Sequence, residues 1–428
     1  MGEILIVFSF LFLFLYSLQK THIYYAMKYV VIIGDGMADF PLKELKGKTP
    51  LQVANIPNLD KLTQEGQTGL MRTTYKDLPI GSIVANMAIL GFDPRLYYPN
   101  GRASFEAISH NVYLNENDIA FRCNLISIEN DIITDFTSGL IEDNKALNIL
   151  LNIKFKHKGI EIYPGQSYRN ILTIKDVICD ASDIKAYEPH MNIGKSIHEV
   201  CLESKSDKST KITKLLNEMM FDSIKQIKHL NSIYKTKIGM IWLWSPSSTP
   251  HMPSFEKQYK VKGAVVCGLD FMRGIGKSSG MTSQEIKGAT GYLDSCLKEK
   301  TKYAINFLNN HDFVYIHVNA PDEEAHQHNA INKIKAIERI DEEIIGPIAS
   351  HFDNQKIPYR IAVLPDHYTL THNGKHHDKP VPFMVCGKGI EKNSVTQFNE
   401  DAINSENQKI ILAHSFMDKF LNDYWNNN

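Results

Sequence analysis

The sequence predicts an α/β fold built on a doubly wound, mostly parallel sheet, which is interrupted by an inserted α+β domain. Three short apolar runs predict its inner strands, at residues 29–33 (YVVII), 313–318 (FVYIHV) and 361–364 (IAVL). Continuous runs of β-branched and aromatic side chains are typical of strands that are buried on both faces. Apolar residues recur at three- and four-residue steps in 297–308 and 331–345, which predicts helices packed against that sheet.

The domain organisation follows from chain length and from a change of pattern. A chain of 428 residues is too long for one compact core, so two domains are expected. Alternating segments at 131–136 and 168–174 indicate antiparallel strands, and the polar stretch 203–211 indicates an exposed linker. The predicted divisions are an N-terminal extension at 1–26, a main domain at 27–107 and 283–428, and an inserted domain at 108–282.

Bulk composition narrows the possible partners. The formal net charge is −1, so the chain has no global basic field that would attract nucleic acid or an anionic membrane. The six cysteines are scattered, and no two of them form a C-x-x-C pair. The scattered cysteines predict free thiols in a reducing compartment such as the cytoplasm.

The N-terminal 26 residues differ from the rest of the chain. Residues 4–18 form a charge-free apolar run, shorter than the roughly 20 residues that a spanning helix needs. No basic residue precedes this run, as one would in a signal peptide. Because the first core strand follows directly, we expect Met27 to be the physiological start. A signal-anchor and a cleaved leader remain the alternatives.

Metal-ligand residue types collect where the predicted strands end. The candidates are Asp35, Asp322, His326, Asp366, His367, His376 and His377. Asp322 and His326 lie one turn apart on the helix that Pro321 begins. Each of these residues alone could be a helix cap or a surface side chain. Converging carboxylates would repel one another, however, so together they predict a pair of cations. Mixed nitrogen and oxygen ligands suit Mn²⁺ or Zn²⁺ better than an all-oxygen Mg²⁺ site.

A serine supplies a reacting group for those cations. Residues 79–87 (PIGSIVANM) indicate a loop that enters a helix, and the Ser82 hydroxyl would lie at its N-terminus, where backbone N–H groups favour a phosphate. The alternative is that Ser82 is only an N-cap. Residues 274–278 (GIGKS) imitate a phosphate-binding loop, but Phe271 stands where that motif needs glycine.

Many segments together resemble one family. They are IIGDGMAD (32–39), KTPLQVANIPNLDKL (48–62), GSIVANMAILGFDP (81–94), AFRCNL (120–125), YPGQSYRN (163–170), IWLW (241–244), GATGYLD (288–294), APDEEAH (320–326), KIKAIERIDE (333–342), LPDH (364–367) and DKPVPF (378–383). From Met27 to about Phe420 the chain is similar to the archaeal-type 2,3-bisphosphoglycerate-independent phosphoglycerate mutases, within the alkaline phosphatase superfamily. This resemblance implies interconversion of 3-phosphoglycerate and 2-phosphoglycerate through a phosphoserine.

The resemblance also implies a role for each candidate residue. Ser82 would be the nucleophile, and two divalent ions would be bound, Mn²⁺ foremost, with Mg²⁺, Zn²⁺ or Co²⁺ as alternatives. One ion would be held by Asp35, Ser82, Asp366 and His367, and the other by Asp322, His326 and His376, with His377 as the fallback. Arg122 and Arg169 of the inserted domain, with Arg102 as a further candidate, would bind substrate carboxylate or phosphate. Each arginine could instead form a structural ion pair.

The sequence departs from this family at two positions. Ile83 replaces the acid that usually follows the nucleophile, and Asn170 replaces the histidine that usually follows S-Y-R.

Two other enzyme activities are possible for a phosphoglycerate-binding chain. A cofactor-dependent mutase is excluded, because no arginine in the chain is followed by histidine as its nucleophile motif requires. The remaining alternative is a metal-dependent phosphomonoesterase on the same scaffold.

Overall fold

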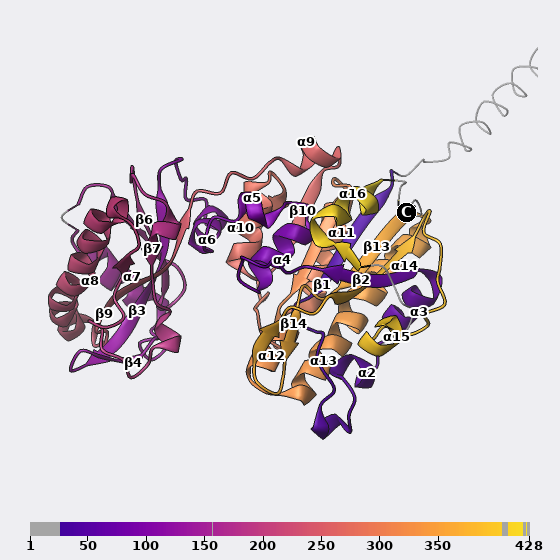
Figure 1. The fold of residues 1–428 in the computed structure, drawn as a ribbon, viewed down its shortest axis with the longest axis horizontal. Helices are drawn as coiled ribbons and strands as arrows, with labels where there is room; N and C mark the ends of the chain where they lie inside the picture. Colours follow the sequence, from indigo (N-terminus) through magenta and orange to yellow (C-terminus); the bar gives the residue numbers. More distant parts are fainter. Residues whose placement is uncertain (1–25, 156, 405–409, 423–424, 426–428) are drawn as a thin grey trace, which may run out of the picture.

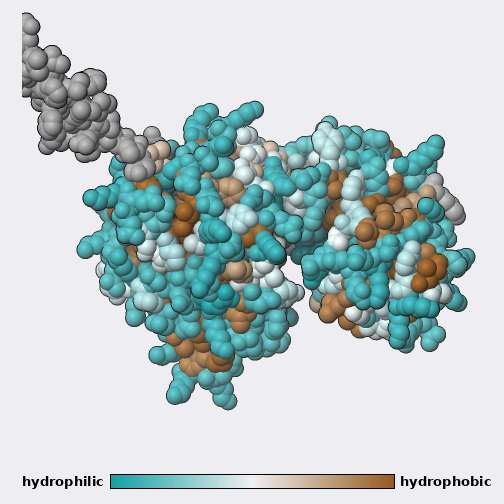
Figure 2. All heavy atoms as spheres, turned by 180° about the vertical axis from the view of Figure 1, so that it is seen from behind, coloured by the Kyte–Doolittle hydropathy of each residue, from teal (hydrophilic) through white to brown (hydrophobic). Residues whose placement is uncertain are grey.

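The computed structural model describes residues 26–155, 157–404, 410–422 and 425. Figure 1 shows two lobes, a larger one around a central sheet and a smaller one around a second sheet. Seen from behind, hydrophilic side chains cover most of both lobes, and hydrophobic ones gather in small patches (Figure 2). Within the described ranges no helix combines the length and apolarity needed to cross a bilayer. The apolar run at 4–18 lies outside these ranges.

The central sheet confirms the predicted fold class. Its eight strands, in spatial order, are β11 (Thr282–Ser283), β10 (Gly263–Val266), β12 (Phe313–Val318), β1 (Lys28–Gly34), β13 (Tyr359–Leu364), β16 (Val381–Gly387), β2 (Gln67–Arg72) and β17 (Ile410–Leu412). All neighbouring pairs are parallel except the two that β16 makes with β13 and β2. Only β16 therefore runs against the others. All three predicted inner strands are present, side by side as β12, β1 and β13.

Side chains of the inner strands alternate between two apolar cores. Val31 and Ile33 of β1 enter one core, whereas Val30 and Ile32 enter the other. All four are fully buried, which explains why their run is continuously apolar. The register pairs Ile33 with His317 of β12 and with Leu364 of β13. The carboxyl ends of these three strands therefore lie level with one another.

Helices cover both faces of the central sheet (Figure 1). Those in contact with the first core are α4 (Ser82–Ile89), α6 (Ala103–Ser109), α9 (Phe255–Tyr259), α10 (Asp270–Ser278) and α16 (Phe416–Leu421). Those in contact with the second are α2 (Pro50–Val53), α3 (Pro57–Glu65), α11 (Leu297–Leu308), α13 (Ala330–Ile340), α14 (Gly346–Gln355) and α15 (Glu400–Asn404). The predicted helices at 297–308 and 331–345 are both present, and a π-turn at Asp341–Ile345 joins α13 to α14.

Shorter elements complete the larger lobe. They are α5 (Pro94–Tyr97), α12 (Ala320–His326), the 3₁₀ turns Lys43–Leu45 and Ala413–Ser415, and the antiparallel pair β14 (Tyr368–Leu370) and β15 (Lys375–His377). The turn, the helix and the strand pair that follow β1, β12 and β13 lie at one edge of the sheet. That edge carries the candidate site.

The smaller lobe has an antiparallel sheet and its own core. Its strands are β3 (Ile119–Glu129), β4 (Ile132–Asp135), β5 (Ile160–Tyr163), β6 (Arg169–Ile174) and β9 (Met240–Ser248). Its other elements are α7 (Asp143–Asn152), α8 (Asp207–Tyr234), β7 (Ile184–Lys185), β8 (Glu203–Ser204) and the 3₁₀ turns Ala181–Asp183 and Pro189–Met191. Its core is formed by the inner face of the sheet with α7 and α8. The segments predicted as antiparallel at 131–136 and 168–174 are β4 and β6.

Two sequence-based boundaries are wrong. The segment 203–211, predicted as an exposed linker, contains β8 and the first turn of α8, where Ser206 and Ser209 form a capping box. The inserted domain was predicted to extend to residue 282, but β10 pairs with β12 in the central sheet. Residues 263–283 therefore belong to the larger lobe, because the four-residue strand β10 is too short for its pattern to reveal which sheet it joins.

Candidate active site

The candidate site lies at the carboxyl edge of β1, β12 and β13. Asp35 directly follows β1, Asp322 lies in the first turn of α12, and Asp366 and His367 follow β13. All four are nearly or fully buried. Gly36 has a φ of 58°, and a Cβ there would collide with the side chains of Thr369 and Asp322. The glycine after Asp35 is thus required by both the backbone conformation and the close approach.

Ser82 faces these groups from the opposite side. It is the first residue of α4, and Gly81 takes the N-cap position, so the alternative of Ser82 as the helix N-cap is wrong. Its Oγ lies 3.3 Å from Asp35 Oδ2 and 3.2 Å from His367 Nε2. The hydroxyl of Ser82 is therefore within contact distance of two candidate ligands.

Two overlapping groups of ligand atoms occur among the described residues. The carboxylates of Asp35 and Asp366 and the imidazole of His367 form one group, and Asp322, His367 and His376 form the other. Within each group the donor atoms lie within 4.8 Å of one another. His367 belongs to both, because its Nε2 lies beside Asp35 while its ring centroid lies 4.0 Å from that of His376.

His326 extends the second group. Its Nε2 lies 3.3 Å from Asp322 Oδ2 and 3.2 Å from His376 Nε2. Backbone carbonyls hold both rings by their other nitrogen, since the Nδ1 atoms of His326 and His376 lie 2.8 Å from Gly374 O and 3.0 Å from Ile80 O. These contacts place both Nε2 atoms towards Asp322. His377, in contrast, pairs with the neighbouring Asp378 and contacts the ring of Phe40. The structure therefore brings His376, and not its neighbour, into the cluster.

Like charges disfavour ionisation of the carboxylates in the first group. Burial raises the pKa of Asp35 well above its usual value, and the carboxylates of Asp366 and Asp322 raise it further. Burial also acts to raise the pKa of Asp366, but the imidazoles of His367 and His317 outweigh it, so that the pKa lies below the usual value. One carboxylate of the pair thus retains its charge at the expense of the other.

The second group is stabilised by opposite charge. Burial, which would raise the pKa of Asp322, is outweighed by hydrogen bonds from His326 and His376, so the pKa lies well below its usual value. The bond to Asp322 raises the pKa of His326, and the same partner outweighs burial to raise that of His376.

The donor set fits divalent cations. Three buried carboxylates and the imidazoles of His326, His367 and His376 converge at one edge of the sheet, and a cation would favour the charged form of Asp35, which burial and the neighbouring carboxylates disfavour. Imidazole and carboxylate ligands together suit Mn²⁺, Zn²⁺ or Co²⁺. Asp35, Ser82, Asp366 and His367 would hold one ion, and Asp322, His326 and His376 the other.

Two of the three predicted arginines share a carboxylate and a ring. Nε of Arg122 lies 2.9 Å from Glu106, and that of Arg102 lies 3.6 Å from the same side chain. The guanidinium carbons of Arg122 and Arg102 lie 4.4 and 5.2 Å from the centre of the Trp244 ring. Burial and the charge of Arg102 lower the pKa of Arg122 to about 10. The positive charge here exceeds the single negative charge of Glu106.

Arg169 connects this cluster to the site. Its guanidinium carbon lies 4.9 Å from the centre of the Tyr168 ring, at the start of β6. The charge of Arg169 also acts on Glu323, which neighbours Asp322 in α12, and on Tyr292 of the larger lobe. This arginine of the smaller lobe is therefore close enough to the larger lobe to act on its charged groups.

Sequence reasoning missed several residues that support the site. The Asn86 amide donates to Asp366 Oδ2 at 2.8 Å and to Ser82 O at 2.7 Å, and the Tyr315 hydroxyl donates to Asn86 Oδ1 at 2.5 Å. Thr369 Oγ1 donates to Asp322 Oδ1 at 2.6 Å. Asn86 lies four residues after Ser82 on the same helix, which is a spacing that could have identified it.

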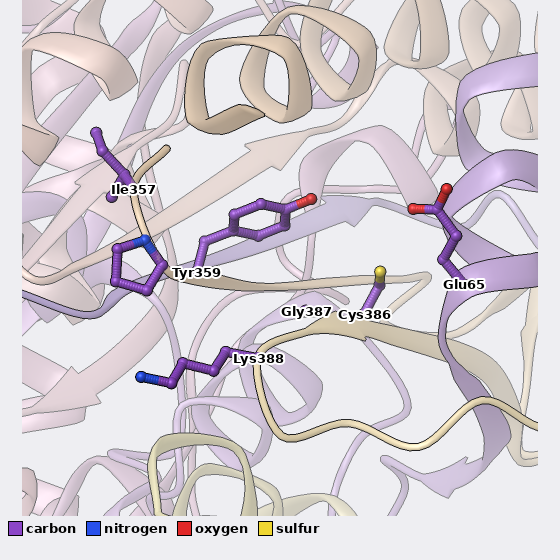
Figure 3. A pocket seen from close by; sticks show the side chains of 7 residues that line it. Glu65, Ile357, Tyr359, Cys386, Gly387 and Lys388 are labelled. Carbon is purple, nitrogen blue, oxygen red and sulfur yellow. The ribbon is translucent and has the colours of Figure 1, made fainter. Parts of the chain in front are cut away.

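A separate cavity of about 420 Å³ lies where β13 begins, at the opposite end of the strands from the candidate site. Figure 3 shows Tyr359, Cys386 and Lys388 among its lining residues, together with Glu65. Tyr359 begins β13, whereas Asp366 and His367 follow the end of that strand. This cavity is therefore distinct from the candidate site.

Comparison with known proteins agrees with this geometry. The family model described as 2,3-bisphosphoglycerate-independent phosphoglycerate mutase matches residues 63–231. The chain is 38% identical over 396 residues to 2,3-bisphosphoglycerate-independent phosphoglycerate mutase 2 of Methanothermobacter thermautotrophicus, covering 92% of this chain and 96% of that protein. The enzyme of that family from Methanothrix thermoacetophila is also 38% identical, over 380 residues, covering 87% of this chain and 94% of its own.

Similarity extends to a solved structure. The PH0037 protein from Pyrococcus horikoshii superimposes with a TM-score of 0.76 at 26% identity, covering 93% of this chain and 98% of that one. The similarity in sequence thus spans both lobes and all the candidate ligands. On this evidence the chain belongs to the family of 2,3-bisphosphoglycerate-independent phosphoglycerate mutases.

Proposed function

We propose that the chain interconverts 3-phosphoglycerate and 2-phosphoglycerate through a phosphoserine on Ser82, with two divalent metal ions. The proposal rests on one observation above all: the Ser82 hydroxyl lies 3.3 Å from Asp35 and 3.2 Å from His367. A serine at the N-terminus of a helix and beside metal-ligand side chains is the arrangement that covalent phosphoryl transfer needs. Membership of the family supports this assignment of substrate.

The metal ions would be held by residues that follow β1, β12 and β13, together with Ser82 of α4 and His376 of β15. Bound there, divalent ions would lower the pKa of the Ser82 hydroxyl and spread the negative charge of the phosphoryl group during transfer. We propose Mn²⁺ first, with Zn²⁺, Co²⁺ and Mg²⁺ as alternatives. His326, His376 and Asp322 supply two imidazoles and a carboxylate, a set that disfavours Mg²⁺.

The transfer itself is a double displacement at phosphorus. Ser82 Oγ forms a bond to phosphorus while the bond from phosphorus to O3 of glycerate breaks, and the proton lost by Ser82 ends on the departing oxygen. Glycerate then turns in the site. Its 2-hydroxyl attacks the phosphoserine, Ser82 recovers a proton, and 2-phosphoglycerate leaves. No second phosphorylated molecule is consumed, which is consistent with independence from 2,3-bisphosphoglycerate.

The smaller lobe, together with the start of α6 in the larger lobe, would retain glycerate between the two transfers. Arg122, Arg169 and Arg102 present guanidinium groups, which bind carboxylate or phosphate in two-pronged fashion. Arg122 and Arg102 already share Glu106, so that part of their charge remains for an anion. We therefore assign the three arginines to substrate binding. We also propose that the protein is located in the reducing cytoplasm, because its six cysteines are all free thiols.

Trapping the phosphoenzyme tests this proposal directly. Protein incubated with 3-phosphoglycerate and quenched in acid should carry one phosphoryl group on Ser82, located by peptide mass spectrometry. Ser82→Ala should form none and lose turnover, while Ser109→Ala, whose hydroxyl bonds within its own helix, should behave like the parent. Chelation should abolish activity and Mn²⁺ should restore it. A phosphoryl group on another residue, or full activity without divalent metal, would refute the mechanism.

A further inference from the structure

A buried imidazole lies behind the carboxylates of the site. His317 is the fifth residue of β12, and its side chain is fully buried. Its Nε2 lies 3.4 Å from Asp35 Oδ2 and 4.0 Å from Asp366 Oδ2. These are ion-pair distances rather than full hydrogen bonds. His317 is thus directed at both carboxylates of the group next to Ser82, although it belongs to neither group of candidate ligands.

The other ring nitrogen of His317 contacts a buried thiol. Its Nδ1 lies 3.6 Å from Cys267 Sγ, and the backbone N–H of Leu269 donates to the same sulfur at 3.1 Å. The ring of Phe271 packs against the imidazole, with an interplanar angle of 81°. Both Cys267 and His317 are fully buried. The imidazole is therefore fixed in place by neighbours on the segment that follows β10.

The two ring nitrogens of His317 have different neighbours. A bare lone pair on Nε2 would face two carboxylate oxygens, which is electrostatically unfavourable, so Nε2 presents an N–H to Asp35 and Asp366. Cys267 Sγ lies on the Nδ1 side of the ring and, together with the ring of Phe271, fixes its orientation. A row of contacts thus runs from Leu269 through Cys267 and His317 to Asp35.

We propose that His317, held in place by Cys267, is a positioning residue that orients Asp35 and Asp366 towards the metal ion that would be bound beside Ser82. The inference rests on the proposed two-metal function, and it adds residues that no motif singled out. A partner that fixes the orientation of ligating carboxylates commonly changes metal affinity about 10–100-fold when it is removed. The role is therefore one of affinity at a single ion, and not of contact with substrate.

Metal binding provides a test that does not depend on turnover. Mn²⁺ is titrated into metal-free protein, and the free ion is followed by electron paramagnetic resonance. The variants are His317→Leu, His317→Gln, Cys267→Ala and Cys267→Ser, with Cys386→Ala as the control, since Cys386 is another buried cysteine of the central sheet. Circular dichroism and the metal-free thermal midpoint report whether each variant is folded.

The expected pattern is selective. His317→Leu should weaken one of two Mn²⁺ sites about 10–100-fold and leave the other unchanged. His317→Gln, which keeps an N–H near the position of Nε2, should recover most of that loss. Cys267→Ala should lower the same affinity, Cys267→Ser should keep most of it because a hydroxyl preserves a polar contact with Nδ1, and Cys386→Ala should change neither site.

Other results would overturn the inference, and they differ from a failure of the proposed function. Folded His317→Leu with parental affinity at both sites would exclude the positioning role, and equal loss at both sites would show a general effect on the fold. If Cys267→Ser behaves like Cys267→Ala, the polar contact with Cys267 does not hold the imidazole. Cys267→Ser is the smallest change, and it tests this contact even if His317→Leu does not fold. If the parent protein binds no Mn²⁺, the two-metal function itself is wrong.

Discussion

Two fully buried tyrosines show how much a single hydroxyl can contribute. Tyr315 on β12 donates to Asn86 Oδ1, and Asn86 in turn donates to Asp366 and to the backbone of Ser82. The hydroxyl of Tyr368 is equally buried, but it has no hydrogen-bond partner among the described residues. The same chemical deletion at these positions therefore removes an anchored hydrogen bond in one case and an unpaired polar group in the other.

We predict that Tyr315→Phe lowers the free energy of unfolding by about 1–3 kcal/mol, because Asn86 Oδ1 is left buried without its donor. It should also lower kcat, since the amide that holds Asp366 loses its own support. Tyr368→Phe should be neutral or stabilising and should keep kcat. Chemical denaturation and a coupled enolase assay measure the two quantities. Equal effects of the two substitutions would show that the bond to Asn86 is unimportant.

At the residue scale, the sequence predicts the candidate metal ligands better than it predicts the residues that hydrogen-bond to them. Asp35, Asp322 and Asp366 could be found because each follows a strand whose apolar run is visible. The contact of Tyr315 with Asn86 joins residues 229 positions apart. No local period encodes such a hydrogen bond, because it depends on how a helix and a strand pack side by side.

The junction of α6 and α10 shows how two short helices are held together. His110 ends α6, Asp270 begins α10, and the His110 Nε2 atom lies 3.0 Å from Asp270 Oδ2. The hydrogen bond to Asp270 raises the pKa of His110 above its usual value. A cation at the C-terminus of one helix and an anion at the N-terminus of the other also suit both helix dipoles.

We predict a pH-dependent contribution from this pair. Because the pKa of His110 is higher in the folded chain than in the unfolded one, the stabilisation is fully present below about pH 6.5 and is lost as the pH rises through the folded value. His110→Gln should therefore lower the thermal midpoint more at pH 6 than at pH 8.5. In an Asp270→Asn background this difference should shrink, as a double-mutant cycle would reveal. A constant difference across this range would exclude the pair as its cause.

At the element scale, the three inner strands and the helices around 297–308 and 331–345 were predictable, whereas the 28-residue helix α8 and the packing partners of these elements were not. The motif-like segment 274–278 lies in α10, and a Cβ at Gly274 would collide with the backbone of Phe105 in α6. That glycine thus permits close helix packing and does not cradle a phosphate. Its role depends on a helix almost 170 residues away, so that the local sequence could not reveal it.

At the scale of the whole molecule, the order of the strands in the central sheet determines where the candidate site forms. Parallel neighbours β12, β1 and β13 bring their carboxyl ends together, as α/β sheets generally do. The antiparallel strand β16 and the position of β2 beyond it could not be predicted, since no periodicity specifies a neighbour. The three arginines were named from the family resemblance, but the ion pairs with Glu106 and the proximity of Arg169 to the larger lobe could not be predicted, because they depend on how the two lobes approach each other.

Under the proposed mechanism, the arginines of this arrangement would distinguish a mutase from a phosphatase. Both activities would use Ser82 and the metal ions, so that only the time that glycerate remains beside the phosphoserine distinguishes them. A charge-assisted hydrogen bond contributes about 1.5–3 kcal/mol, and about 1.4 kcal/mol corresponds to a tenfold change in rate. Loss of an arginine that holds glycerate should therefore let it escape, after which water attacks the phosphoserine.

We predict that Arg169→Ala lowers mutase activity at least tenfold while the slow release of inorganic phosphate persists or rises. Lys175→Ala is the matched control, because Lys175 directly follows the far end of β6 and pairs with Glu161. The measured quantity is the ratio of 2-phosphoglycerate formed to inorganic phosphate released. An unchanged ratio in Arg169→Ala would place the glycerate clamp elsewhere. If the parent protein itself releases mainly phosphate, the chain is a phosphomonoesterase, and the retention of glycerate by the second lobe is wrong as well.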